Sequence, residues 1–203
     1  MQTISDTSAF LSAALRQPGV IGAVAPSGPA LAEVLAAVVP GRDKPVVAEL
    51  GPGTGPVSRV IGRRLPPGGR HFAVEIDPEL ADRLELTHPD VEVLRGDAAD
   101  LGALLYGAGV RQVDAVVSGL PWSLFPEAQQ RAILEQVCYV LAPGAGFSTF
   151  AYRISTPTAG GRRFRALLHE YFEEVVVSRT IWRNLPPALV YLCRRPTVDR
   201  TDA

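Results

Sequence analysis

Cysteine, histidine and long hydrophobic runs are all scarce in this chain of 203 residues. Its two cysteines, Cys138 and Cys193, stand in separate apolar stretches, which fits neither a disulfide scaffold nor a zinc site. We therefore expect two buried thiols in a reducing compartment and no bound metal ion. No apolar run approaches the roughly 18 residues that cross a bilayer, and no signal peptide is recognisable at the N-terminus. These absences predict a cytoplasmic protein without a membrane span.

Neither sign of charge is in excess, because 20 basic and 21 acidic residues leave a net charge of −1. A chain that coats nucleic acid through a general positive charge is thereby excluded. The charge is nevertheless uneven: residues 1–152 carry 11 basic and 16 acidic side chains, whereas residues 153–203 carry 9 and 5. The first part suits a cationic ligand, and the second suits an anionic acceptor or a membrane surface.

Hydrophobic residues make up 47% of the chain, which also has 19 glycines and 18 prolines. This composition fits one globular domain with many turns. Short β-branched runs alternate with helical segments, which is typical of a parallel sheet with helices on both faces. The expected strands are 45–50, 70–76, 91–95, 113–118 and 146–152, and the expected helices between them are 57–65, 78–86, 100–106 and 127–141.

Both ends of the chain depart from this alternation. Near the C-terminus, a helix at 163–170 precedes two strands, 172–181 and 188–193, which we expect to close the sheet as an antiparallel pair. Near the N-terminus, one helix ends by Gln17 and a second covers 29–39. We therefore expect an N-terminal helical extension, a main α/β domain and a flexible tail, at 1–40, 41–195 and 196–203.

The segment Glu49-Leu-Gly51-Pro-Gly53-Thr-Gly55 lies where the first strand ends and a helix begins. Glycines at such a turn let the chain bend tightly and let a ligand approach the backbone. Glu75 and Asp97 follow the next two strands, where the first suits ribose hydroxyls and the second suits the amino edge of an adenine. Each feature alone also fits a plain turn or a helix cap. Their occurrence at three successive strand ends favours a nucleoside site.

The charge of that nucleoside follows from a departure from the dinucleotide pattern. Pro56 stands where G-x-G-x-x-G needs its third glycine. Glu49, two residues before the first glycine, would repel a pyrophosphate but would orient an ammonium group, directly or through water. We therefore predict a nucleoside that carries a positive charge.

These residues resemble the motifs of class I S-adenosylmethionine-dependent methyltransferases. The glycine segment looks like their first motif, and Glu75 and Gly96-Asp97-Ala98 fall where they bind ribose and adenine. The resemblance covers about residues 45–195 and implies a Rossmann-like, seven-stranded, mostly parallel sheet with an antiparallel last strand. It also implies S-adenosyl-L-methionine as cofactor, with S-adenosyl-L-homocysteine as its product. The implied cofactor-binding residues are Glu49, Gly51, Pro52, Gly53, Thr54, Gly55, Glu75, Ile76, Asp97, Ala98, Ser118, Gly119 and Leu120.

A second motif, Ser118-Gly-Leu-Pro121-Trp122, ends the fourth strand, where this superfamily places the sulfonium and the incoming nucleophile. Main-chain carbonyls there can accept hydrogen bonds from an amine. The motif is similar to the Asn-Leu-Pro-Tyr motif of ribosomal RNA adenine dimethylases, but Gly119 replaces the Asn that would grip the target amine and Trp122 replaces the Tyr. This departure weakens the case for methylation of a base.

A closer similarity is to bacterial phospholipid N-methyltransferases, relatives of those dimethylases. Their Gly-Ala-Val-x-Pro-Ser, Ser-x-Leu-Pro and Trp-Arg-Asn-Leu-Pro-Pro-Ala segments are matched by residues 22–27, 118–121 and 182–188, although Trp122 departs from the usual apolar residue. The similarity implies methylation of the amine of phosphatidylethanolamine or a related aminolipid. A nucleic-acid adenine methyltransferase and a small-molecule N- or O-methyltransferase are the alternatives. Nucleic acid is the less favoured partner, because no appended RNA-binding domain follows residue 195.

The candidate catalytic residues are Trp122 and Tyr152. The ring of Trp122 can hold a base by stacking or an ammonium by cation–π attraction; the alternative is a turn with a packing Trp. Tyr152, at the end of the fifth strand, is the candidate proton acceptor or amine orienter, since no histidine lies in a predicted site turn. It fits an edge-of-core tyrosine equally well.

The candidate acceptor-binding residues are Ser27, Trp122, Arg153 and Arg183. The planar guanidinium groups suit the lipid phosphate, although each arginine also fits a solvated surface. The apolar face from Phe10 to Leu15 suits either a membrane contact or a lid over the cofactor. We expect a monomer that meets an aminophospholipid, at the periphery of the inner face of the cell membrane.

Overall fold

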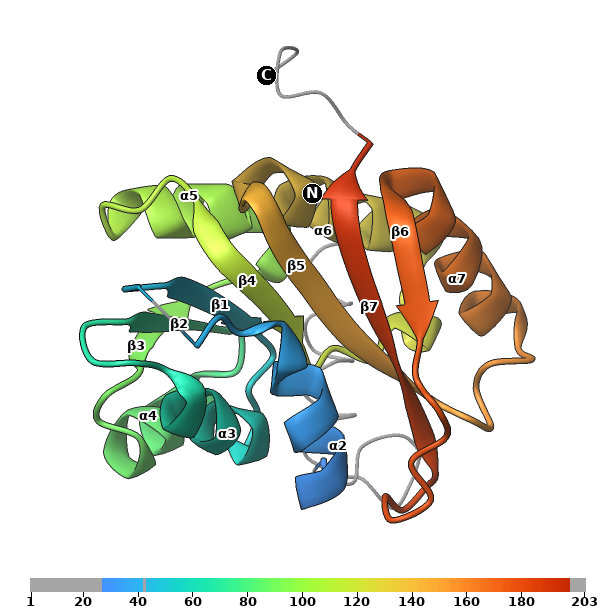
Figure 1. Cartoon of the computed structure of the whole chain (residues 1–203), viewed down its shortest axis with the longest axis horizontal. Coiled ribbons are helices and arrows are strands. Elements are labelled where there is room, and N and C mark those ends of the chain that lie inside the picture. Colours follow the sequence, from blue (N-terminus) through green and yellow to red (C-terminus); the bar gives the residue numbers. More distant parts are fainter. Residues whose placement is uncertain (1–26, 42, 198–203) are drawn as a thin grey trace.

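The structure, a computed structural model, describes residues 27–41 and 43–197. Within them, seven strands form one sheet that helices surround (Figure 1). The strands are β1 (Val46–Leu50), β2 (Arg70–Glu75), β3 (Glu92–Arg95), β4 (Val113–Ser118), β5 (Leu141–Tyr152), β6 (Phe172–Val177) and β7 (Ala188–Pro196). The helices are α2 (Pro29–Leu35), α3 (Pro56–Arg64), α4 (Pro78–Thr87), α5 (Leu101–Gly107), α6 (Glu127–Val140) and α7 (Ala159–Tyr171), with the 3-10 helices η1 (Ala36–Val38), η2 (Ala98–Asp100) and η3 (Trp122–Leu124).

The strands follow the order β3-β2-β1-β4-β5-β7-β6 across the sheet. Neighbours are parallel except at β7, which runs antiparallel to both β5 and β6. The chain order reverses between β1 and β4, where Leu50 pairs with Ser118. Open α/β sheets bind ligands in the crevice beyond the carboxyl ends of the strands at such a reversal. The glycine segment after β1 and the turn after β4 both lie at this place.

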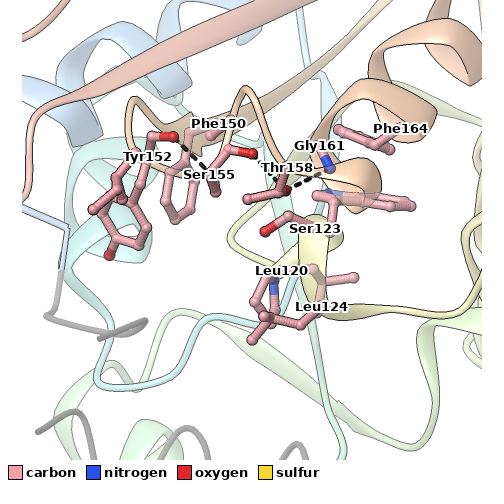
Figure 2. A pocket seen from close by; sticks show the side chains of 13 residues that line it. Leu120, Ser123, Leu124, Phe150, Tyr152, Ser155, Thr158, Gly161 and Phe164 are labelled. Atoms are coloured by element: carbon pink, nitrogen blue, oxygen red, sulfur yellow. Dashed lines mark hydrogen bonds between the residues drawn. The ribbon is translucent and has the colours of Figure 1, made fainter. Parts of the chain in front are cut away.

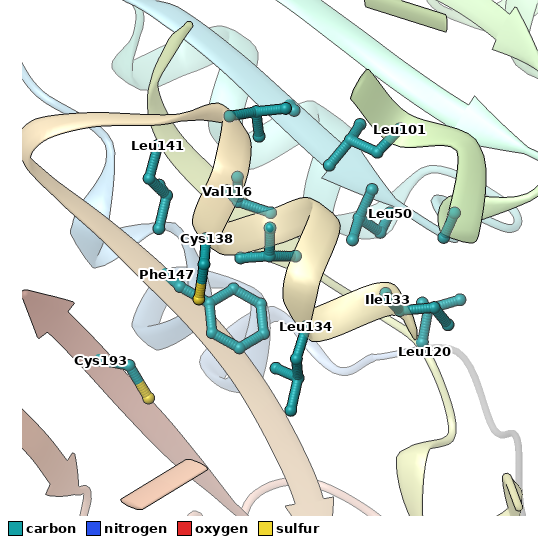
Figure 3. Packing of buried hydrophobic residues seen from close by; sticks show 14 of the residues in the cluster. Leu50, Leu101, Val116, Leu120, Ile133, Leu134, Cys138, Leu141, Phe147 and Cys193 are labelled. Atoms are coloured by element: carbon teal, nitrogen blue, oxygen red, sulfur yellow. The ribbon is translucent and has the colours of Figure 1, made fainter. Parts of the chain in front are cut away.

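Successive side chains of a strand point to opposite faces of the sheet. An apolar cluster covers each face of the central strands. On one face, Leu50, Val116 and Phe147 pack with side chains of α5, α6 and α7 (Figure 3). On the other face, Val47 and Val117 pack with side chains of α2 and α3. The two apolar clusters, one on each face, therefore fix the strand ends and the loops that follow them.

The predicted fold class is confirmed, since the sheet has seven strands and a single antiparallel member. One expectation changes: the helix foreseen at 29–39 is α2 followed by η1, and Leu31 and Leu35 are fully buried against the sheet. The described part of the expected N-terminal extension thus packs into the core, and the domain boundary at residue 40 stays a prediction. The helix expected before Gln17, and the tail beyond residue 197, lie outside the described residues.

The cysteines are core residues, as the sequence predicts. Cys138 of α6 and Cys193 of β7 are both buried and unbridged. Burial raises the pKa of each thiol to about 12, so neither is a thiolate at neutral pH. In the described ranges, no helix is long and apolar enough to reach across a bilayer.

Candidate active site

The glycine segment forms the turn from β1 into α3. Gly51, Gly53 and Gly55 have φ angles of 65°, 57° and 81°, which only glycine adopts without strain. A Cβ atom on Gly51 would lie 2.7 Å from a methyl carbon of Leu120, so the turns after β1 and β4 touch each other. A Cβ atom on Gly53 would meet nothing within 4 Å, which leaves the backbone there open to a ligand.

Glu75 ends β2 directly opposite this turn. Its side chain is 2% exposed, and its two carboxylate oxygens accept hydrogen bonds from the backbone N–H groups of Gly53 (3.2 Å) and Asp77 (3.0 Å). Burial raises the pKa of this carboxyl above its ordinary value, and the N–H groups of Asp77 and Gly53 oppose that shift. Each oxygen keeps a second lone pair, so Glu75 can accept further hydroxyl donors while it supports the glycine turn.

Glu49 lies deeper than the sequence analysis expects. It is 1% exposed, its Oε2 atom accepts a hydrogen bond from the Ser58 hydroxyl at 2.7 Å, and the same atom lies 3.0 Å from Nε2 of His71. The carboxylate thereby ties β1 to α3 and β2 beneath the glycine turn. Its contact with an ammonium group stays a prediction. Neither Ser58 nor His71 carries a motif in the sequence, and only the register of β1 on β2 brings His71 here.

Asp97 has the capping role that the sequence analysis left open. Its Oδ1 atom accepts a hydrogen bond from the backbone N–H of Ala99 at 2.9 Å, at the start of η2. Ala98 is buried, and Ile76 is partly buried just after β2. The cap uses one oxygen atom of Asp97 and fixes the loop between β3 and α5, so a second role toward an adenine edge remains open to it.

The turn after β4 is packed against β1. The backbone N–H of Gly119 donates to the carbonyl of Leu50 at 2.8 Å, and a Cβ atom on Gly119 would lie 2.6 Å from the carbonyl oxygen of Gly51. An asparagine, as in the dimethylase motif, has no room at this position. The carbonyls of Leu120 and Pro121 accept hydrogen bonds from the N–H groups of Trp122 and Leu124, and each keeps a second lone pair.

Trp122 differs from the expectation of an open aromatic face. The side chain is 2% exposed, and its ring stacks on Phe164 with centroids 4.5 Å apart and planes 15° apart. Its indole N–H donates to the Ser118 hydroxyl at 3.0 Å. Phe164 of α7 therefore covers the ring face that would hold a base or an ammonium. The hydrogen bond to Ser118 fixes the polar side of the same indole.

Two residues that the sequence analysis missed hold this turn in place. Gln130 of α6 is fully buried; its side-chain amide donates to the carbonyl of Trp122 at 2.6 Å and accepts from Arg163 Nε at 3.2 Å. Arg163 also donates to the carbonyl of Phe125 at 3.1 Å. A polar residue at a core-facing position of the helix was the only available signal for Gln130.

Beside this turn lies a pocket of about 270 Å³ between η3, the end of β5 and the start of α7 (Figure 2). Among the residues that the structure describes, no charged side chain lines it; the lining residues are Leu120, Pro121, Trp122, Ser123, Leu124, Phe150, Ala151, Tyr152, Ile154, Ser155, Thr158, Gly161 and Phe164. The Thr158 hydroxyl donates to the carbonyl of Ser155 at 2.7 Å and accepts from the N–H of Gly161 at 3.1 Å. We name this cavity the acceptor pocket.

Tyr152 reaches the acceptor pocket from the end of β5 and is 7% exposed. Burial raises the pKa of its phenol, which opposes formation of a tyrosinate at neutral pH. Of the two roles foreseen for it, orientation of an amine therefore fits the structure better than removal of a proton.

The remaining predicted residues, Ser27, Arg153 and Arg183, lie on loops outside the lining of this pocket. The N–H of Gly28, next to Ser27, donates to Oδ1 of the buried Asn184 at 2.8 Å. This contact places Ser27, the last residue of the 22–27 segment, next to the 182–188 segment. Arg153 and Arg183 are exposed, and Arg153 donates to the hydroxyl of Thr180 at 3.4 Å.

The comparisons with known proteins agree with this geometry. A protein of Singulisphaera acidiphila described as an ornithine lipid N-methyltransferase is 36% identical over 194 residues, which cover 94% of this chain and 97% of that protein. The chain belongs to the class I S-adenosylmethionine-dependent methyltransferases. The family model described as a methyltransferase domain matches residues 47–144 of this methyltransferase.

Solved structures share the fold of the methyltransferase at lower identity. An O-methyltransferase from Bacillus cereus in complex with S-adenosyl-L-homocysteine has a TM-score of 0.65 at 17% identity, covering 96% of this chain and 92% of that one. The O-methyltransferase TomG from Streptomyces achromogenes in complex with S-adenosyl-L-methionine has a TM-score of 0.62 at 19% identity, covering 94% and 90%. At these identities the likeness establishes the architecture.

The residues at the reversal of chain order between β1 and β4 fit the cofactor of the methyltransferase. The open backbone at Gly53 leaves space for the methionine part, and the inward-facing Glu75 carboxylate has free lone pairs for ribose hydroxyls. Ile76, Asp97 and Ala98 would hold the adenine, while Ser118, Gly119 and Leu120 would lie near the sulfonium. When bound, S-adenosyl-L-methionine supplies an electrophilic methyl group.

Proposed function

We propose that the methyltransferase methylates the amine of an aminolipid head group, such as that of phosphatidylethanolamine or of an ornithine-bearing lipid. The observation that carries this proposal is the acceptor pocket, which adjoins the turn after β4 and has an apolar, uncharged lining with a few hydroxyl groups. The description of the Singulisphaera relative, with 36% identity over nearly the whole of both chains, narrows the acceptor to an amine-bearing lipid.

An uncharged pocket helps the chemistry of an amine. An ammonium has no lone pair and must lose a proton before it attacks a methyl group. Removal from water disfavours the charged form, so burial in the acceptor pocket lowers the pKa of the amine. Within the described part of the chain, no lining carboxylate opposes this effect by stabilising the ammonium. The pocket thereby favours the reactive form without needing a strong base of its own.

The chain positions the amine rather than activating it chemically. The second lone pairs of the Leu120 and Pro121 carbonyls can accept the remaining amine hydrogens, and the Tyr152 hydroxyl can fix the amine from the opposite side. Such positioning aligns the nitrogen lone pair for in-line displacement at the methyl carbon. Exclusion of water by the aromatic lining keeps the methyl group from other nucleophiles.

Two features make the methylation of a nucleic-acid base a weaker fit. Gly119 has no room for the asparagine side chain that would grip an adenine amine, and the ring of Trp122 is stacked on Phe164 instead of standing open for a base. We further propose that the aminolipid is taken from the inner surface of the membrane by a peripherally bound monomer, with Arg153, Arg183 and Ser27 near the lipid phosphate.

The test is methyl transfer from isotopically labelled S-adenosyl-L-methionine to defined acceptors, scored by product mass. Vesicles that contain phosphatidylethanolamine or an ornithine lipid are compared with free ethanolamine, free ornithine and ribosomal RNA. We expect lipid products only, with their masses giving the number of methyl groups added. Cofactor binding by calorimetry without methylation of any lipid amine would refute the proposal, and labelled RNA would replace it by the base-methylating function.

A further inference from the structure

Three large hydrophobic side chains are exposed on two loops, one after β5 and one after β6. Ile154, in the loop between β5 and α7, is 75% exposed. Trp182 and Leu185, in the loop between β6 and β7, are 71% and 83% exposed. Exposed apolar side chains of this size, gathered at one place, mark an interaction surface.

Backbone and side-chain contacts join the two loops. The N–H of Arg153 donates to the carbonyl of Pro187 at 2.8 Å, and the Arg153 guanidinium lies 5.9 Å from the ring centre of Trp182. Ile154, the next residue, also lines the acceptor pocket. Both loops leave the same end of the sheet, toward the lower right of Figure 1.

The charge around these side chains has one sign. Residues 136–169 and 175–198, which include both loops, contain no Asp or Glu. The loops carry three exposed arginines, Arg153, Arg179 and Arg183. An apolar surface with an arginine fringe is complementary to a bilayer of anionic lipids, since the apolar side chains enter the interface and the guanidinium groups meet the phosphates.

The neighbouring helix does not reverse this charge. Gly28, at the start of α2, touches Asn184 of the β6–β7 loop, so α2 is the adjoining element. Its acidic residue, Glu33, is paired with Arg63 at 2.7 Å and with Arg64 at 3.0 Å. The carboxylate of α2 is thus already neutralised by α3.

We propose that Ile154, Trp182 and Leu185, with Arg153, Arg179 and Arg183 around them, form a docking surface for an anionic lipid bilayer. The inference rests on the proposed function, because a lipid acceptor has to pass from a bilayer into the pocket. Because Ile154 belongs to this surface and also lines the acceptor pocket, docking brings the pocket close to the lipid head groups. Docking thereby shortens the path of the amine to the turn after β4.

The first experiment measures binding of the full chain to vesicles by co-sedimentation, with no aminolipid and no cofactor present. The vesicles consist of phosphatidylcholine alone or of phosphatidylcholine mixed with phosphatidylglycerol. We expect binding to the anionic vesicles, weakened by salt. The double variant Trp182→Ser/Leu185→Ser should bind at least about tenfold more weakly, a loss of about 1.4 kcal/mol. The control Leu86→Ser removes a side chain that is 85% exposed on α4, away from both loops, and should leave binding unchanged.

The second experiment uses the fluorescence of the two tryptophans. Trp122 is buried and Trp182 is exposed, so a soluble quencher and a lipid-borne quencher both report on Trp182. We expect Trp182 to be quenched by iodide in the free protein and by brominated lipids on anionic vesicles. Protection from iodide without vesicles would mean that residues 1–26 or a second copy of the chain covers this surface, and it would overturn the proposal. Equal vesicle binding by the double variant would also overturn it.

Failure of the proposed function gives a different result from failure of the docking surface. Vesicle binding that depends on Trp182 and Leu185, without methylation of any lipid, would retain the surface and reject the aminolipid as acceptor. For an active enzyme, the double variant should lose at least about tenfold of its rate on vesicles, again about 1.4 kcal/mol, yet keep its rate on a dissolved short-chain aminolipid. Equal losses on both substrates would assign the two residues to folding or chemistry and reject docking.

Discussion

Two buried carboxylates lie beside the glycine turn and have different partners. The oxygens of Glu75 accept the backbone N–H groups of Gly53 and Asp77, and each keeps a second lone pair. The carboxylate of Glu49 contacts the side chains of Ser58 and His71. Glu75 thus stays the predicted acceptor for ribose hydroxyls.

Replacement of Glu75 by glutamine should weaken cofactor binding more than it weakens folding. The variant keeps the size of the side chain but removes the charge that strengthens each accepted hydrogen bond, by about 1.5 to 3 kcal/mol for charged groups. We expect at least about a tenfold loss of affinity for S-adenosyl-L-homocysteine in calorimetry. The exposed Glu85→Gln is the matched control and should bind normally. Unchanged affinity in Glu75→Gln would show that this carboxylate makes no ligand contact.

The same residue predicts a pH dependence. Burial raises the pKa of Glu75, so the free protein takes up a proton there at a higher pH than the unfolded chain does. Cofactor affinity should therefore be full above that pKa and fall as the pH falls through it. Calorimetric titrations over an acidic pH series measure this fall. The Glu75→Gln variant should show a flatter profile, and parallel profiles for both proteins would assign the pH dependence to another group.

At the scale of elements, the start of α7 closes the acceptor pocket against η3. A Cβ atom on Gly160 would lie 2.1 Å from the carbonyl oxygen of Ser123, and one on Gly161 would lie 2.2 Å from the carbonyl oxygen of Ser155. Two glycines are thus what lets the helix approach this closely. The approach also stacks Phe164 on Trp122 and brings Arg163 to Gln130.

Gly160→Ala should open the acceptor pocket and destabilise the protein by about 1 to 3 kcal/mol, because the added methyl group meets backbone that cannot yield easily. The control is Gly62→Ala in α3, where a Cβ atom would meet nothing within 4 Å; there we expect a gain of about 0.4 to 1 kcal/mol. Urea unfolding gives both values. In Gly160→Ala, methyl transfer should fall more than cofactor affinity does. Equal stability in the two variants would contradict the packing of α7 on η3.

At the scale of the whole molecule, the cofactor site exists only when the sheet is complete. Its residues follow β1, β2, β3 and β4, and the order of these strands brings segments about 70 residues apart into contact. A ligand that needs all four strand ends binds the folded state alone and must stabilise it.

S-adenosyl-L-homocysteine at a hundred times its dissociation constant should therefore raise the free energy of unfolding by about 2.7 kcal/mol. For a chain of this length, the melting temperature should rise by roughly 5 to 10 °C, measurable by calorimetry. NAD is the control and should cause no such rise, since Pro56 replaces the third glycine of the dinucleotide pattern. An equal rise with NAD would contradict the predicted ligand class.

The sequence by itself determined the fold class and predicted the place of the cofactor. Hydrophobic periodicity and glycine-rich turns are local signals, so the alternating strands and helices and the turns at Gly51 and Ser118 were predictable from short segments. The resemblance to a known family implied a seven-stranded sheet with an antiparallel last strand, which is confirmed. The reversal of chain order between β1 and β4 was seen only in the structure.

Only the tertiary structure decided which side chains are open to a ligand. Trp122 reads as an exposed aromatic after a Leu-Pro turn, but Phe164, from a helix about 40 residues later, covers its face. Glu49 stays predicted to orient an ammonium, but only the strand register revealed His71 beside it. Burial depends on what packs from distant parts of the chain, and no local pattern records that. The same reason explains why Trp182, a large apolar residue in the loop between β6 and β7, lies exposed.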